Sequence, residues 1–69
     1  MKYKFRHQGY THIVELVSDE EFATSGFDWH FINQYRKYAP EYEPAYDHSR
    51  KMYKMVNMEF LRKYGIKED

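Results

Sequence analysis

Aromatic side chains supply much of the apolar content of this chain, and this constrains its fold more than any other feature. Its 69 residues include eight Tyr, five Phe and one Trp, while 32% of all residues are charged. Several tyrosines recur at spacings compatible with a helix, namely Tyr35, Tyr38, Tyr42, Tyr46 and Tyr53. These rings must either form a small core or face a partner, and we expect both in a chain of this length.

The length predicts a single small domain over residues 1–69. A chain of this size buries only about 60% of the surface that it exposes when unfolded. It contains no cysteine, so neither a disulfide nor a thiolate metal site can stabilise it. Backbone hydrogen bonds, capped helices or association must supply the stability, which favours a homodimer or a fold completed by a partner.

The charges balance, with eleven basic and eleven acidic residues and a formal net charge of 0. Proteins dedicated to duplex DNA usually carry a clear positive excess, because their affinity comes largely from neutralised phosphates. No apolar run approaches the roughly 18 residues needed to span a bilayer, and residues 1–6 alternate without the apolar core of a signal peptide. We therefore expect a cytoplasmic protein, of the producing or infected cell, with no membrane contact.

The N-terminal residues predict a β-hairpin over about 2–17. Residues 2–7 alternate basic and aromatic side chains, and residues 10–17 are rich in β-branched and aromatic ones. Gln8-Gly9 between them suits a two-residue turn. Pairing His7 with Tyr10 places Phe5 opposite His12 and Lys2 opposite Glu15. One face then collects Tyr3, Phe5, Tyr10, His12, Val14 and Leu16.

Helices are expected over about 19–25, 27–39 and 44–64, followed by a frayed tail over 66–69. Ser18 and Glu21 have the spacing of a capping box, whereas the sequence leaves open whether the helix continues through Gly26. Pro44 suits the first turn of the third helix, and Gly65 suits its end. The expected fold class is α+β: an N-terminal hairpin followed by two or three helices that pack on its aromatic face (ββαα or ββααα).

No motif carries an enzymatic reaction, and we expect neither an enzyme nor a cofactor. The four histidines are His7, His12, His30 and His48, and their spacing matches no zinc motif, so we expect no metal. The serines lack the context of a catalytic nucleophile, and no glycine-rich phosphate loop is present.

Tyrosine and methionine are enriched at protein interfaces, and Met52, Met55 and Met58 would form a second apolar stripe on the third helix. The leading hypothesis is therefore a non-enzymatic module that binds another protein, of the host or otherwise, as an inhibitor or adaptor. Its expected centre is the acidic and aromatic stretch 41–47. The candidate partner-binding residues are Tyr38, Tyr42, Glu43, Tyr46, Met55 and Met58.

The alternative hypothesis is binding of single-stranded nucleic acid or RNA. Basic residues are interleaved with aromatic ones, a mixture in which rings stack on bases and cations meet phosphates. The candidate residues are Lys2, Lys4, Arg6, Arg50, Lys51 and Lys54.

In its shortness, its lack of cysteine and its content of charged residues and tyrosine, the chain resembles small accessory proteins of bacteriophages that bind and redirect host machinery. The resemblance is one of composition, with no diagnostic motif behind it.

Overall fold

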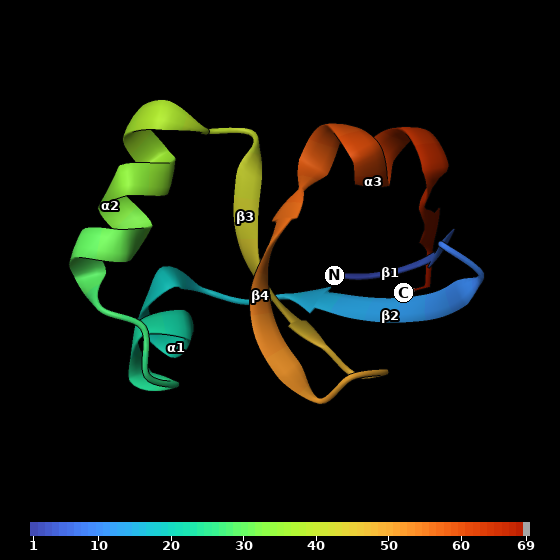
Figure 1. Ribbon diagram of the computed structural model, residues 1–69, viewed down its shortest axis with the longest axis horizontal. Coiled ribbons are helices and arrows are strands. Elements are labelled where there is room, and N and C mark those ends of the chain that lie inside the picture. Colours follow the sequence, from blue (N-terminus) through green and yellow to red (C-terminus); the bar gives the residue numbers. More distant parts are fainter. Residues whose placement is uncertain (69) are drawn as a thin grey trace.

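The computed structural model describes residues 1–68, which form a five-stranded antiparallel sheet and three helices (Figure 1). The strands lie in the order β4-β3-β2-β1-β5. In chain order the elements are β1 (Lys2–His7), β2 (Tyr10–Leu16), α1 (Asp19–Thr24), α2 (Trp29–Tyr38), β3 (Tyr42–Asp47), β4 (Met52–Asn57), α3 (Met58–Tyr64) and β5 (Ile66–Lys67). Helices α1 and α2 thus connect two hairpins, and α3 leads back to the strand beside β1.

The predicted fold class, a hairpin followed only by helices, is wrong. Strands occupy both ends of the described chain, and the predicted third helix over 44–64 divides into most of β3, all of β4 and α3. Residues 66 and 67 of the expected frayed tail pair with β1 as β5. Asp69, the last residue of that tail, lies outside the described residues.

A tight turn replaces the middle of the predicted third helix. The Asp47 carboxylate accepts hydrogen bonds from the backbone N–H groups of Ser49 (2.9 Å) and Arg50 (3.1 Å), and Lys51 has a positive φ of 55°. Such local acceptance of backbone donors by Asp competes with helix formation. The cationic partner of Asp47 is Lys54 on the next strand.

Pro44 lies inside a central strand, although proline cannot donate to a sheet ladder. The β2–β3 ladder ends at the pair Leu16–Ala45, so Pro44 is one residue beyond it. There its carbonyl still accepts from Val17 N–H at 3.1 Å, and no donor is needed in return. A proline that suited a helix start is therefore also compatible with this position inside β3.

The N-terminal hairpin has the predicted register. His7 pairs with Tyr10, Phe5 with His12 and Lys2 with Glu15. Gln8 and Gly9 both have positive φ values, 52° and 82°, as in the mirror-image turns that match the twist of paired strands.

The first two predicted helices are present as α1 and α2. Ser18 caps α1 by accepting from Glu21 N–H at 3.0 Å, and Asp28 caps α2 by accepting from Phe31 N–H at 2.8 Å. The helix does not continue through Gly26, because that residue has a φ of 123°, which is far from helical.

Alternating side chains give the sheet two faces, and each is covered differently. Helix α3 covers one face and forms a core there with Tyr3, Val14, Ala45, Val56, Met58 and Leu61. Helix α1 lies against the opposite face at β3 and β4, where the rings of Phe22 and Tyr53 are 6.4 Å apart. The expectation that all the helices pack on the aromatic face of the hairpin was therefore wrong, since only α3 contacts Phe5 there, through Phe60.

We predict that Gly9→Ala lowers the free energy of unfolding by about 1–2 kcal/mol, because a Cβ is unfavourable at a positive φ. Nothing lies within 4 Å of the added Cβ, so the cost is conformational and not steric crowding. Gln8→Asn is the matched variant and should leave stability unchanged or raise it, since Asn tolerates this conformation. Urea denaturation measures both, and equal stabilities for all three proteins would contradict the turn assignment.

Candidate functional site

Asp47 lies at the centre of a buried polar cluster on the α3 side of the sheet. Its side chain is fully buried, and His12 is only 5% exposed. Asp47 Oδ2 lies 3.1 Å from His12 Nδ1 and 2.7 Å from Lys54 Nζ, while Oδ1 accepts the two turn N–H groups. The Phe5 ring stacks on His12 with the centroids 5.0 Å apart. Every acceptor position of the carboxylate is thereby engaged by the protein itself.

This cluster sets the ionisation of Asp47. Burial by itself would raise the pKa of the carboxyl group, but hydrogen bonds from Lys54, His12 and the backbone of Arg50 outweigh it and lower the pKa to about 2. Asp47 is therefore an anion at neutral pH and is matched by the charge of Lys54. All the partners of Asp47 belong to the strands and to the β3–β4 turn. We therefore interpret the cluster as one that holds β2, β3 and β4 together.

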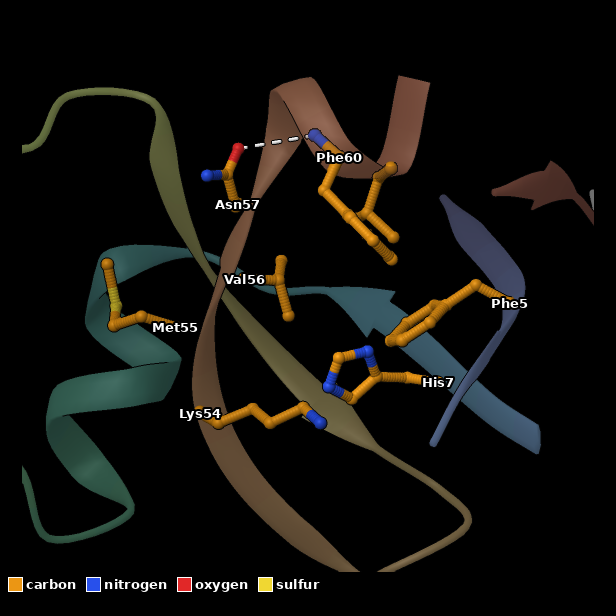
Figure 2. Close-up of a pocket in the computed structure, with 8 residues that line it drawn as sticks. Phe5, His7, Lys54, Met55, Val56, Asn57 and Phe60 are labelled. Carbon is orange, nitrogen blue, oxygen red and sulfur yellow. Dashed lines mark hydrogen bonds between the residues drawn. The ribbon is translucent and has the colours of Figure 1, made fainter. Parts of the chain in front are cut away.

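A groove of about 220 Å³ lies beside the cluster, between β4, α3 and the end of β1 (Figure 2). Its apolar walls are Phe5, Val56, Phe60 and Leu61, and the polar side chains of His7 and Lys54 reach into it. Met55 also borders the groove, but its side chain points away toward α1 (Figure 2). The only full charge directed into the groove, that of Lys54, is already compensated by Asp47.

The opposite face of the β1–β2 hairpin is uncovered and basic. Lys4 pairs with Ile13 on one side and Ile66 on the other, and Arg6 pairs with Thr11. Tyr64 borders this area with its ring 59% exposed, and Ile66 is 66% exposed. We call this surface the basic face, and its residues are Lys4, Arg6, Thr11, Ile13, Tyr64 and Ile66.

The cations of the basic face are available for an outside partner. Neither Lys4 nor Arg6 forms an ion pair with any described residue, and Arg6 only donates to the carbonyl of Gly9 at 3.2 Å. Part of the face is hollowed into a groove of about 460 Å³, lined by Lys4, Phe5, Arg6, Thr11, Tyr64 and Ile66. A second hollow shares Thr11 and adds Tyr10, which is 65% exposed and has Arg50 over its ring at 5.7 Å.

Glu15 bounds the basic face toward β3. Its Oε1 lies 2.9 Å from His48 Nε2, and this hydrogen bond lowers the pKa of the carboxyl group. Glu15 also pairs with Lys2 across the hairpin. The carboxylate therefore faces His48 and Lys2, at the opposite end of the hairpin from Arg6.

Acidic and basic residues are segregated along the molecule. Residues 18–43 carry six acidic and two basic side chains, whereas residues 1–17 and 44–68 carry nine basic and four acidic ones. Figure 1 shows α1 and α2, which belong to the first segment, at one end of the long axis, and the β1–β2 hairpin, α3 and β5 toward the other. The net charge of 0 thus combines a charge of −4 on residues 18–43 with +5 on residues 1–17 and 44–68, and Asp69 supplies the remaining −1.

The predicted partner-binding residues are not brought together on one surface. Tyr38 is 70% exposed on α2, while Tyr42, Tyr46 and Met55 are partly buried on the strands. Glu43 forms an ion pair with Arg36. The sixth candidate, Met58, is 8% exposed and belongs to the core under α3. The proposed methionine stripe does not exist, because Met52 and Met55 lie on β4.

Of the six predicted nucleic-acid-binding residues, all but Lys54 lie on exposed surfaces of the sheet or its turn. Lys2, Lys4 and Arg6 all project from the uncovered side of β1, and Arg50 and Lys51 lie in the β3–β4 turn. The exception is Lys54, which points to the other face and binds Asp47. The sequence analysis named neither Tyr64 nor Ile66 as a binding residue, because it placed Tyr64 at the end of the predicted third helix and Ile66 in the frayed tail. The separation of acidic residues in 18–43 from basic residues in the flanking segments, by contrast, is visible in the sequence itself.

Two negative findings concern only the described part of the chain. Residues 1–68 contain no group of three or more His, Asp or Glu side chains placed to hold a metal ion. None of the three helices there is long and apolar enough to cross a membrane.

Comparisons of the chain with protein-family models, with curated proteins and with solved structures found no match.

We predict an acid-dependent loss of stability that originates at Asp47. Its folded-state pKa of about 2 is below the ordinary value of 3.8, so the unfolded chain binds the proton first as pH falls. The contribution of ionised Asp47 to the free energy of unfolding is complete above about pH 5. It falls by about 2 kcal/mol in total as the pH is lowered toward 2. Urea denaturation of the wild type and of Asp47→Ala should therefore show a stability difference that shrinks by this amount over that range.

Glu20→Gln is the control for this experiment, because Glu20 is exposed and its carboxylate has no partner among the described residues. Its stability curve should run parallel to that of the wild type. A pH-independent difference between the wild type and Asp47→Ala would contradict the ionised, hydrogen-bonded state of Asp47.

Proposed function

We propose that this protein binds single-stranded nucleic acid on its basic face. The observation that carries the proposal is that Lys4 and Arg6 form no ion pair with any residue the structure describes, on a sheet face that none of the described helices covers, beside the exposed side chain of Tyr64. Cations on such a surface attract phosphates, and an exposed ring can stack on a base. A cytoplasmic location, as expected from the sequence, suits this function.

The distribution of charge answers the main objection to this proposal. A net charge of 0 disfavours nucleic-acid binding only if the charges are mixed over the surface. Here four of the six carboxylates of residues 18–43 belong to α1 or to the cap of α2, at one end of the molecule, whereas the basic face belongs to the other end. With a Debye length of about 10 Å at 0.1 M salt, a phosphate chain on the basic face is largely screened from that end of a molecule 32 Å long.

Tyr64 adds an aromatic ring to the basic face, and Lys63 lies over this ring at 5.4 Å. Tyr10 is also exposed and has Arg50 over its ring at 5.7 Å, but the hairpin register places it on the face of His12, at the turn end of the hairpin. Aromatic rings next to cations suit a flexible strand with splayed bases better than a duplex, whose bases are stacked internally. We therefore propose single strands as the ligand.

Replacing Lys4 and Arg6 together by Glu should weaken binding of a fluorescent oligonucleotide of about 12 residues by at least about tenfold. Fluorescence anisotropy measures this loss. The double variant Lys4→Ala/Arg6→Ala should also reduce the slope of log affinity against log salt by about 1.4, since each phosphate contact contributes about 0.7 for a single strand. Tyr64→Ala should cost about tenfold in affinity with no change in this slope.

Lys37→Glu on α2 is the control for charge reversal, because it makes the same change per substituted residue on an exposed cation away from the basic face. It should alter the affinity by less than about twofold. Equal losses from the control and from the basic-face variants, or no measurable binding by the wild type at low salt, would overturn the proposal.

Binding of another protein is the second candidate, and one observation favours it. Helix α2 buries only Ile32 fully and exposes Trp29 (49%), Phe31 (36%) and Tyr38 (70%). A shallow apolar hollow lies between Gln34, Tyr35, Tyr38 and Ala39 on the same helix. Exposed aromatic side chains of this kind are typical of interfaces, which suits an inhibitor or adaptor.

For this candidate, we predict that Tyr38→Ala abolishes capture of a protein partner from nuclease-treated lysate and leaves the melting temperature within about 1 °C, because the ring is mostly exposed. Affinity capture with mass spectrometry and thermal denaturation provide the two measurements. A partner retained equally by Tyr38→Ala and by the wild type would exclude α2 as the interface.

A further inference from the structure

We propose that the basic face has a second ligand, the acidic end of another copy of this chain, so that copies associate head to tail. We further infer that nucleic acid and the neighbouring copy compete for the same surface, a step that rests on the proposed function. We define the acidic end by the hollow between α1 and α2, which is lined by Glu20, Ala23, Thr24, Phe27, Asp28 and Trp29.

The acidic end presents an aromatic anchor between two carboxylates. Trp29 is 49% exposed, Asp28 precedes it as the cap of α2, and Glu20 lies across the hollow on α1. The carboxylate of Glu20 has no partner among the described residues, whereas Asp28 accepts one backbone N–H. A partly exposed Trp with flanking charges is the kind of group that forms the centre of an interface.

The basic face offers the complementary arrangement. Its groove of about 460 Å³ has apolar walls in Tyr64 and Ile66, with Lys4 and Arg6 beside them, while the ring of Phe5 lies on the α3 side against His12 and Phe60. An indole ring inserted there would cover the exposed ring of Tyr64 and the side chain of Ile66. The two carboxylates beside the indole would meet two cations that have no ion-pair partner within the described chain, and a cation near the indole adds a favourable interaction.

The geometry favours chains of molecules over a closed pair. The two surfaces lie toward opposite ends of a molecule whose longest dimension is 32 Å, so one copy cannot satisfy its own basic face (Figure 1). An interface between two different surfaces of identical copies repeats without limit unless a rotation closes it into a ring. The net charge of 0 also removes the overall repulsion that would oppose association at low salt.

Sedimentation velocity of the wild type over a range of concentrations tests the association. At low ionic strength the mean sedimentation coefficient should increase continuously with concentration. Raising the salt from about 0.03 M to about 0.3 M should weaken association by on the order of tenfold, because the interface joins opposite charges. A monomer at all concentrations and salts, or a dimer that grows no further, would overturn the proposal.

Complementary variants identify the surfaces. One variant, Glu20→Lys with Trp29→Ala, loses the acidic end and keeps the basic face. The other, Lys4→Glu with Arg6→Glu, loses the basic face and keeps the acidic end. Each alone should be monomeric, and an equimolar mixture should form a two-copy complex through the one intact pair of surfaces. The absence of a complex in the mixture would overturn the assignment of the two surfaces.

Folding of the variants needs its own control. All the substituted residues are exposed, and circular dichroism of the double variants and of the single variants Glu20→Lys and Lys4→Glu detects a folding defect.

Adding a single-stranded oligonucleotide to the associated wild type separates the two proposals. Dispersal into protein–oligonucleotide complexes supports a shared surface. If the oligonucleotide binds while the head-to-tail assemblies persist, the proposed competition between nucleic acid and the neighbouring copy would be overturned. Association without any oligonucleotide binding would overturn the proposed function, while the head-to-tail contact would be supported by the variant mixture.

Discussion

The buried carboxylate of Asp47 is the interaction on which the rest of this structure depends. It joins β2 through His12, β4 through Lys54 and the β3–β4 turn through two backbone N–H groups. An anion taken out of water is costly unless it is paired and hydrogen-bonded, and removing one partner of such a pair typically costs about 3–5 kcal/mol. The turn, the pairing of β3 with β4 and the position of β2 are therefore linked through a single side chain.

This arrangement determines which surfaces the molecule can use. Because β3, β4 and β5 extend the hairpin into a five-stranded sheet, α3 can cover one face while α1 contacts the other at β3 and β4. The opposite side of the β1–β2 hairpin remains uncovered, with Lys4 and Arg6 on it. The proposed site is thus the part of the sheet that three short helices do not reach.

The aromatic residues show how a small chain makes two cores. On one side, Phe60 joins Phe5 to Tyr64, with His12 stacked on Phe5. On the other, a series of neighbouring rings connects the strands to α1 and α2, through Tyr46, Tyr53, Phe22, Phe27, Phe31, Tyr35 and Tyr42. Large rings reach across gaps that the few aliphatic residues could not fill. Those at the margins, such as Tyr64 and Trp29, remain exposed and carry the proposed interactions.

The sequence by itself determined the elements whose signals are local. The hairpin register follows from side-chain alternation and a two-residue turn, and the starts of α1 and α2 follow from caps at Ser18 and Asp28, of which only the first was recognised. The basic residues of β1 and the segregation of charge along the chain were also readable. None of these features requires knowledge of distant contacts.

Only the tertiary structure decided the conformation of residues 44–57 and the identity of the exposed surface. Pro44 and the apolar spacing beyond it suit a helix as well as a strand, and the choice depends on Asp47, whose partners lie 7 and 35 residues away along the chain. The same long-range pairing turns Lys54 toward Asp47 and brings Ile66 and Tyr64 beside Lys4 and Arg6. Local helix and strand propensities differ by only about 1 kcal/mol per residue, whereas leaving a buried charge without its partner costs about 3–5 kcal/mol.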